Sequence, residues 1–175
     1  AALGTFVNPN GVNHRRTQLQ FPDIGTDSPI MVAAIQTSED TDTANLRVTN
    51  VTADGAQVWV DEEKSRGREI RHAKEVVAGI VLTGGDLIAT SSREGGDDDQ
   101  APYDYDNAVG EAGWVSNLNH EWQTIELDHT YKKPAIAFGP LSFNGSHEST
   151  IRIRNVTPNS FDVRIQEWNF LDGWH

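Results

Sequence analysis

The chain has 175 residues, which is enough for one ordinary domain or for two small ones. Its 26 acidic residues against 14 Lys and Arg give a net charge of −12, which repels phosphate backbones and anionic lipid surfaces. We therefore expect no nucleic-acid partner and no membrane insertion. The absence of cysteine excludes disulfides and thiolate chemistry.

Residues 8–83 have the pattern of a small β-sandwich. Apolar side chains recur at every second position, at Leu46 and Val48 and again at Val58 and Val60, which is the period of two that a half-buried strand requires. The turn-forming cluster at residues 50–55 favours an antiparallel hairpin between these strands. The apolar run at residues 75–82 predicts a further strand that closes the unit.

Residues 84–113 interrupt this pattern with an acidic, glycine-rich stretch, whose composition predicts a linker or a long loop. Its clustered aspartates offer the oxygen ligands that Ca²⁺ prefers: Asp97, Asp98, Asp99, Asp104 and Asp106. Their spacing is not that of an EF-hand loop. A Ca²⁺ site and a solvated acidic linker both stay open as interpretations.

Residues 114–175 repeat the pattern of the first unit. Residues 46–52 align with residues 151–157 at an offset of 105, and four of the seven positions are identical. A second match upstream has an offset of 106, which a single loop deletion explains. No window shows sustained helical spacing, so the sequence predicts two diverged all-β copies of one antiparallel sandwich or barrel unit.

The two copies differ at their closing strand. The first continues past His72 into the strand of residues 75–82, whereas the second reaches His175 where the equivalent strand would begin. An uncovered sheet edge favours aggregation, so we expect something to cover it. The apolar residues 1–7 are the candidate, either within one chain or by strand exchange in a homo-oligomer. The alternative is that the sequence is a fragment of a longer protein.

Both copies share an order of features: a strand, a turn with proline, an apolar strand, a seven-residue run and an alternating strand. In the run, an Arg stands between two branched aliphatic residues, and Asn-Val-Thr follows after one variable position. The residues that carry it are Pro29, Leu46–Thr52, Val58, Val60 and Val76–Leu82, and then Pro134, Ile151–Thr157 and Phe161–Trp168. This pattern resembles the H-type lectin domain, in two tandem copies of which the second lacks its final strand.

The resemblance implies a six-stranded antiparallel sandwich that commonly trimerises and binds galactose-type sugars at subunit interfaces. The first copy departs from the family pattern, because Gly55 and Ala56 stand where the family usually has an aromatic residue after the turn. The second copy departs by its missing strand. The family's binding residues therefore do not carry over one by one.

Trp59 is a candidate ligand-binding residue, because its neighbours Val58 and Val60 are expected to face the core and so direct it outward. An outward Trp either stacks on a sugar ring or anchors an interface between subunits or between the two copies. We favour the interface, since Trp so often anchors such contacts.

The last eight residues combine aromatic rings with polar side chains. As a sugar site they offer Trp168, Asn169, Asp172, Trp174 and His175, which is the mixture that polar ligands need. The alternative is that the rings plug the end of the sandwich.

No nucleophile elbow, phosphate-binding loop or dinucleotide fingerprint is present, so we expect no enzyme. The first hypothesis is a non-catalytic carbohydrate-binding or adhesion module, extracellular or at a surface, with glycans or other subunits as partners. The second is a structural subunit of a virion, tail fibre or surface appendage, assembled through the sandwich and the N-terminal strand.

Overall fold

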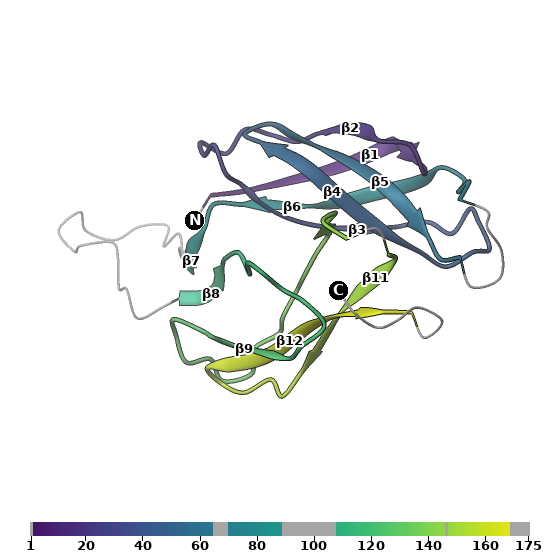
Figure 1. Cartoon of the computed structure of the whole chain (residues 1–175). Coiled ribbons are helices and arrows are strands. Elements are labelled where there is room, and N and C mark those ends of the chain that lie inside the picture. The colour runs from purple at the N-terminus through teal and green to yellow at the C-terminus, as the bar shows by residue number, and fades with distance from the viewer. Residues whose placement is uncertain (1, 65–69, 89–107, 146, 169–175) are drawn as a thin grey trace.

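The computed structural model describes residues 2–64, 70–88, 108–145 and 147–168. Within these ranges the chain is all-β, as the sequence predicts (Figure 1). It contains twelve strands in four sheets. No helix that is long and apolar enough to cross a membrane occurs in the described ranges.

The first half, residues 2–88, folds as a sandwich of two antiparallel sheets (Figure 1). One sheet, with β6 at its centre, contains β1 (Leu3–Val12), β6 (Glu75–Leu82) and β3 (Ile30–Ile35). The other, with β5 at its centre, contains β4 (Ala44–Thr52), β5 (Gly55–Glu62) and β2 (Thr17–Gln20). Six strands of this half therefore enclose one core.

Alternate side chains of the two central strands fill this core. Val58 on β5, and Val77 and Val81 on β6, are completely buried. Each contributes about 1.5–3 kcal/mol relative to an exposed position. The sheet also needs a glycine at position 79, because a Cβ there would lie 2.3 Å from the carbonyl oxygen of Val32.

Residues 2–7 do not complete the second copy within this chain, so that form of the prediction is wrong, while strand exchange between chains stays a prediction. Leu3 lies opposite Leu82 and Asn8 opposite Val77, in an antiparallel pairing of β1 with β6. The ring of Phe6 is buried in the first core. The physical reason is that β6 is a central strand that needs a partner on each edge, and β3 supplies only one of them. The first sandwich therefore begins before residue 8.

The second half, residues 108–168, repeats one sheet of the first half. This sheet, with β12 at its centre, contains β11 (Ser149–Arg154), β12 (Ser160–Glu167) and β9 (Gln123–Glu126). The register is the same in both copies: Thr17 lies opposite Val58, and Gln123 lies opposite Val163. The offsets of 106 and 105 between these pairs are those of the sequence repeat.

The hairpin turns of the two copies also agree in detail. Asn50 and Asn155 adopt left-handed backbone angles, with φ of 49° and 50°, which Asn tolerates better than most residues. Thr52 and Thr157 each donate a side-chain hydrogen bond to the carbonyl oxygen three residues later, at 3.0 and 3.2 Å. The repeat therefore extends to the hydrogen bonds of the turn.

The stretch of residues 84–113 is not a continuous loop. It contains β7 (Gly85–Ile88) and β8 (Ala108–Ala112), which pair antiparallel. The Glu111 carboxylate on β8 accepts hydrogen bonds from the backbone N–H groups of Asp128 and His129, at 3.0 and 3.2 Å. Strand β8 is thus tied to the second half. Residues 89–107 lie outside the described ranges.

The two halves meet at β4, where the short strand β10 (Leu141–Ser142) pairs in parallel with it. Arg47 on β4 is 1% exposed. Its Nε donates to Asp61 at 2.9 Å, and its Nη2 donates to the carbonyl oxygen of His147 at 2.8 Å and to the hydroxyl of Ser149 at 3.2 Å. One guanidinium therefore joins both halves.

Replacing this guanidinium tests how the halves are held. Arg47→Ala should lower the free energy of unfolding by about 3–5 kcal/mol, because it leaves buried acceptors of both halves without their donor. Arg152→Ala is the matched control: it is the repeat equivalent, is exposed and bonds to Gln166 at 3.1 Å. The control should change stability by less than about 0.5 kcal/mol. Equal losses in urea denaturation would contradict the assignment.

Candidate functional site

Trp59 lies at the contact between the halves and is only 8% exposed. Its ring makes an edge-to-face contact with Phe143 of the second half, with the centroids 5.3 Å apart. The guanidinium of Arg16 lies 5.0 Å from the ring centroid. This is the interface position favoured from the sequence, and the covered ring is not available as a platform for a sugar.

Of the aromatic cluster at the last eight residues, only Trp168 is described. Its ring is half-buried, and its Nε1 is buried without a hydrogen-bond partner among the described residues. The other candidates lie outside the described ranges: Asn169, Asp172, Trp174 and His175. The same holds for the Ca²⁺ candidates Asp97, Asp98, Asp99, Asp104 and Asp106.

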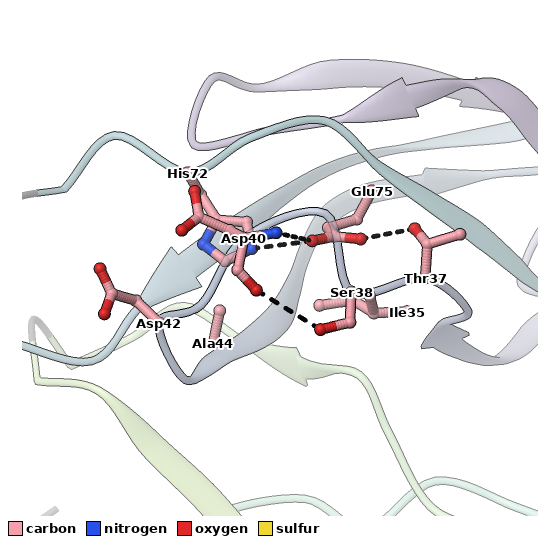
Figure 2. A pocket seen from close by; sticks show the side chains of 8 residues that line it. All are labelled: Ile35, Thr37, Ser38, Asp40, Asp42, Ala44, His72 and Glu75. Atoms are coloured by element: carbon pink, nitrogen blue, oxygen red, sulfur yellow. Dashed lines mark hydrogen bonds and ion pairs between the residues drawn. The ribbon is translucent and has the colours of Figure 1, made fainter.

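A pocket of about 260 Å³ opens at one end of the first sandwich (Figure 2). The loop of residues 36–43, which connects β3 to β4, forms one wall, and the residues entering β6 form the other. Two apolar side chains, Ile35 and Ala44, line it together with six polar ones: Thr37, Ser38, Asp40, Asp42, His72 and Glu75.

Glu75 organises this pocket. It is the first residue of β6 and is 1% exposed, so its carboxylate must find donors inside the protein. The backbone N–H groups of Glu39 and Asp40 donate to Oε1 at 2.8 and 3.2 Å. The Thr37 hydroxyl donates to Oε2 (Figure 2). One carboxylate therefore fixes the path of the whole loop.

These hydrogen bonds set the charge of Glu75. Burial acts to raise its pKa, but the donors from Thr37, Glu39 and Asp40 outweigh burial and hold the pKa below the ordinary value of 4.5. The site therefore keeps a buried negative charge at neutral pH.

His72 lies between two buried carboxylates. Its Nε2 is 3.3 Å from Glu75 Oε1, and its Nδ1 is 3.4 Å from Glu62 Oε2. Its backbone N–H donates to Nδ1 of His14 at 3.2 Å, which anchors the segment that precedes β6. Burial raises the pKa of Glu62 above its ordinary value, although the charge of His72 acts in the opposite direction.

Two aspartates lie at the mouth of the pocket. Asp40 accepts hydrogen bonds from the backbone N–H groups of Ala73 and Thr41, at 2.9 and 2.8 Å. These bonds lower its pKa. In Figure 2, Asp42 stands apart from the bonded group. Asp40 therefore closes the loop, while Asp42 lines the pocket as an exposed carboxylate outside this group.

The pocket offers negatively charged hydrogen-bond acceptors beside two apolar side chains, Ile35 and Ala44. It suits a ligand that is rich in hydroxyl groups or carries positive charge. Among the described residues, no group of three or more His, Asp or Glu side chains is placed to hold a metal ion.

Sequence reasoning noticed His72 only as a landmark of the repeat and missed Glu75 and Thr37. One signal was available: a charged residue opens the strongly apolar strand of residues 75–82. Its partners were not visible, because they lie 35 to 38 residues away in the chain.

Comparisons with protein-family models, with curated proteins and with solved structures find no significant match to this chain. The site is therefore interpreted from its own geometry.

Replacing each buried glutamate by the neutral glutamine should affect the stability of the protein in opposite ways. Glu75 contributes stability above about pH 4.5, which is lost as the pH falls through its lowered pKa. Glu75→Gln should therefore cost about 1–3 kcal/mol at pH 7, and the deficit should shrink in acid. Glu62 has a raised pKa, so its contribution is present at low pH and is lost as the pH rises through that pKa.

We therefore expect Glu62→Gln, the matched control, to leave the stability at pH 7 unreduced. Melting curves of both variants and the parent between pH 3 and pH 7 measure this difference. A Glu75→Gln deficit that stays constant over that range would contradict the assigned role of its charge.

Proposed function

We propose that this protein is a non-catalytic carbohydrate-binding module that acts outside the cell or at a surface, and that its sugar site is the pocket at the end of the first sandwich. The observation that carries the proposal is the fixed set of carboxylate and hydroxyl groups around the 260 Å³ pocket. Sugars are recognised by such acceptors, which bind their hydroxyl groups.

The rigidity of the pocket supports this proposal. Glu75 and Asp40 already hold the loop of residues 36–43 through backbone hydrogen bonds, so binding does not need to order it. Preorganisation of this kind raises affinity because less conformational entropy is lost. Ile35 and Ala44 provide an apolar surface for the C–H groups of one sugar ring.

The volume and charge of the pocket define the class of sugar. A volume of about 260 Å³ lies just below the usual range of about 300–1,000 Å³ for small-molecule sites, which suits a single ring rather than a long oligosaccharide. Asp40, Asp42 and Glu75 repel carboxylated and sulfated sugars. Neutral hexoses and amino sugars at a glycan terminus are the proposed ligands.

The architecture is compatible with the resemblance noted above. An H-type lectin domain implies a six-stranded antiparallel sandwich, and the first half has six strands in two antiparallel sheets. The site proposed here differs from the sequence candidates, because Trp59 is covered by Phe143.

Glycan-array binding of the parent and of Asp42→Ala tests the proposal. Asp42 lines the pocket without a role in holding the loop, so its loss should weaken binding at least about tenfold while leaving the melting temperature unchanged. Asp27→Ala removes an exposed acid on another loop and should bind like the parent.

If Asp42→Ala bound glycans as strongly as the parent, the sugar site would have to lie outside this pocket. An array without any bound glycan would contradict the sugar-binding function itself. If mass photometry of such a sample showed defined oligomers, the structural-subunit hypothesis would replace it.

A further inference from the structure

Two arginines are direct neighbours on the outer face of the sheet in the second half. Phe161, Val163 and Ile165 on β12 are buried, so the alternate residues of this strand point to the opposite face of the sheet. On that face, Arg164 of β12 lies directly opposite Arg152 of β11. Like charges in directly opposite positions of two antiparallel strands repel each other. The pair therefore needs an anion nearby.

The first half shows the same position with its charge neutralised. The repeat equivalents of Arg152 and Gln166 are Arg47 and Asp61. The Nε of Arg47 donates to Asp61 at 2.9 Å, and the Nε of Arg152 donates to the side-chain oxygen of Gln166 at 3.1 Å. The geometry is the same in both copies. In the second copy, however, a neutral amide stands where the first copy has a carboxylate.

A second exchange adds another positive charge to this face. Arg164 stands where the first copy has Trp59, so one Arg and one Asp are replaced by two Arg and one Gln. Among the described residues, no carboxylate forms an ion pair with Arg152 or Arg164. The neighbouring Arg154 differs, because its Nε lies 3.2 Å from Asp162. Two positive charges of this face therefore remain without a negative partner.

Arg164 is held in place and partly removed from water. Its guanidinium lies 4.6 Å from the ring centroid of Trp122. Its Nε is buried and has no hydrogen-bond partner among the described residues. A cation that is poorly solvated gains more from a nearby anion than a fully exposed one does. Stacking on the Trp ring also fixes the guanidinium before a ligand arrives.

The side chains around the two arginines are polar. Thr150 lies opposite Gln166 on one side, and Thr124 lies opposite Asp162 on the other. Hydroxyl and amide groups of this kind bind the hydroxyl groups of sugars. Asp162 is already engaged, because it accepts hydrogen bonds from Thr124 at 2.8 Å and from Asn155 at 2.7 Å. An acidic sugar therefore fits this face better than a neutral one.

The charge of the whole chain limits how acidic the ligand can be. A net charge of −12 repels dense polyanions before they reach any local positive group. The ligand therefore carries one isolated anionic group. A carboxylate is the group that the first copy places beside the equivalent arginine, and two guanidiniums supply the donors that it accepts.

We propose that the outer face of β11 and β12 is a second binding site, which takes the carboxylate of an acidic sugar between Arg152 and Arg164. The ligand carboxylate replaces the one that Asp61 supplies in the first half. That this carboxylate belongs to a sugar rests on the proposed function, whereas the anion site itself does not. The acidic pocket of the first half repels such a ligand, so the two sites select different sugars.

Glucuronic acid and glucose are the probes for the full chain, because they differ only in the carboxylate. In an NMR titration, glucuronic acid should shift the side-chain resonances of Arg152 and Arg164 in a saturable way, and glucose should not. Gln166→Asp restores the pattern of the first half, so the new carboxylate occupies Arg152. Its affinity for glucuronic acid should fall at least about tenfold, with an unreduced melting temperature.

Two matched controls separate this effect from the change in net charge. Gln20→Asp introduces the same charge at an exposed position of the first half and should bind glucuronic acid like the parent. Arg164→Gln should lose binding, whereas Arg15→Gln, which removes an exposed arginine of the first half, should retain it. Unchanged binding by Gln166→Asp overturns the proposal. So does tighter binding of a glutamate-rich peptide than of a glucuronic-acid oligosaccharide.

The outcomes are distinguishable from those that test the pocket. If acidic sugars bind and neutral sugars do not, the site at Arg152 and Arg164 stands and the first-half pocket fails as a sugar site. If neutral sugars bind and glucuronic acid does not, the second site fails while the pocket stands. Asp42→Ala should leave the binding of glucuronic acid unchanged, because it lies in the other half.

Discussion

The arrangement of the two halves depends on one buried cation. Arg47 is taken out of water at the contact, and an ion in that position is tolerated only when its donors are matched by acceptors. Asp61 supplies an acceptor within the first half, while His147 and Ser149 supply acceptors from the second. The equivalent Arg152 has the same register but bonds to Gln166 at the surface, so burial and not residue type makes the difference.

A second feature appears when equivalent positions of the two copies are compared. Arg16 lies over Trp59 at 5.0 Å, and Arg164 lies over Trp122 at 4.6 Å. These pairs occupy equivalent positions with the two residue types exchanged, since 16 aligns with 122 and 59 with 164. The cation–π contact between neighbouring strands is thus retained while the residues that form it have changed places.

This exchange illustrates what the sequence could predict. Period-two alternation and the repeat were sufficient to predict β4, β5, β11 and β12, because both are local patterns. They did not predict β7 and β8, which lie in the stretch expected to be a loop. The pairing of β1 was assigned to the wrong copy, because Gly4 and Phe6 face inward equally well against any apolar sheet. The pocket was missed because its hydrogen bonds join residues that are far apart in the sequence. Glu75 is recognisable as an unusual residue, but its donors come from a distant loop. Long-range pairing carries information that local patterns do not contain.

The two halves place one buried glutamate of the repeat beside different histidines. Glu62 at the end of β5 lies beside His72, which enters β6, so the polar pocket forms where that strand begins. Its equivalent Glu167 lies 3.0 Å from Nδ1 of His147, a residue that precedes β11 instead. The carbonyl oxygen of His147 is the one that accepts from Arg47. The second glutamate is therefore tied to the contact between the halves.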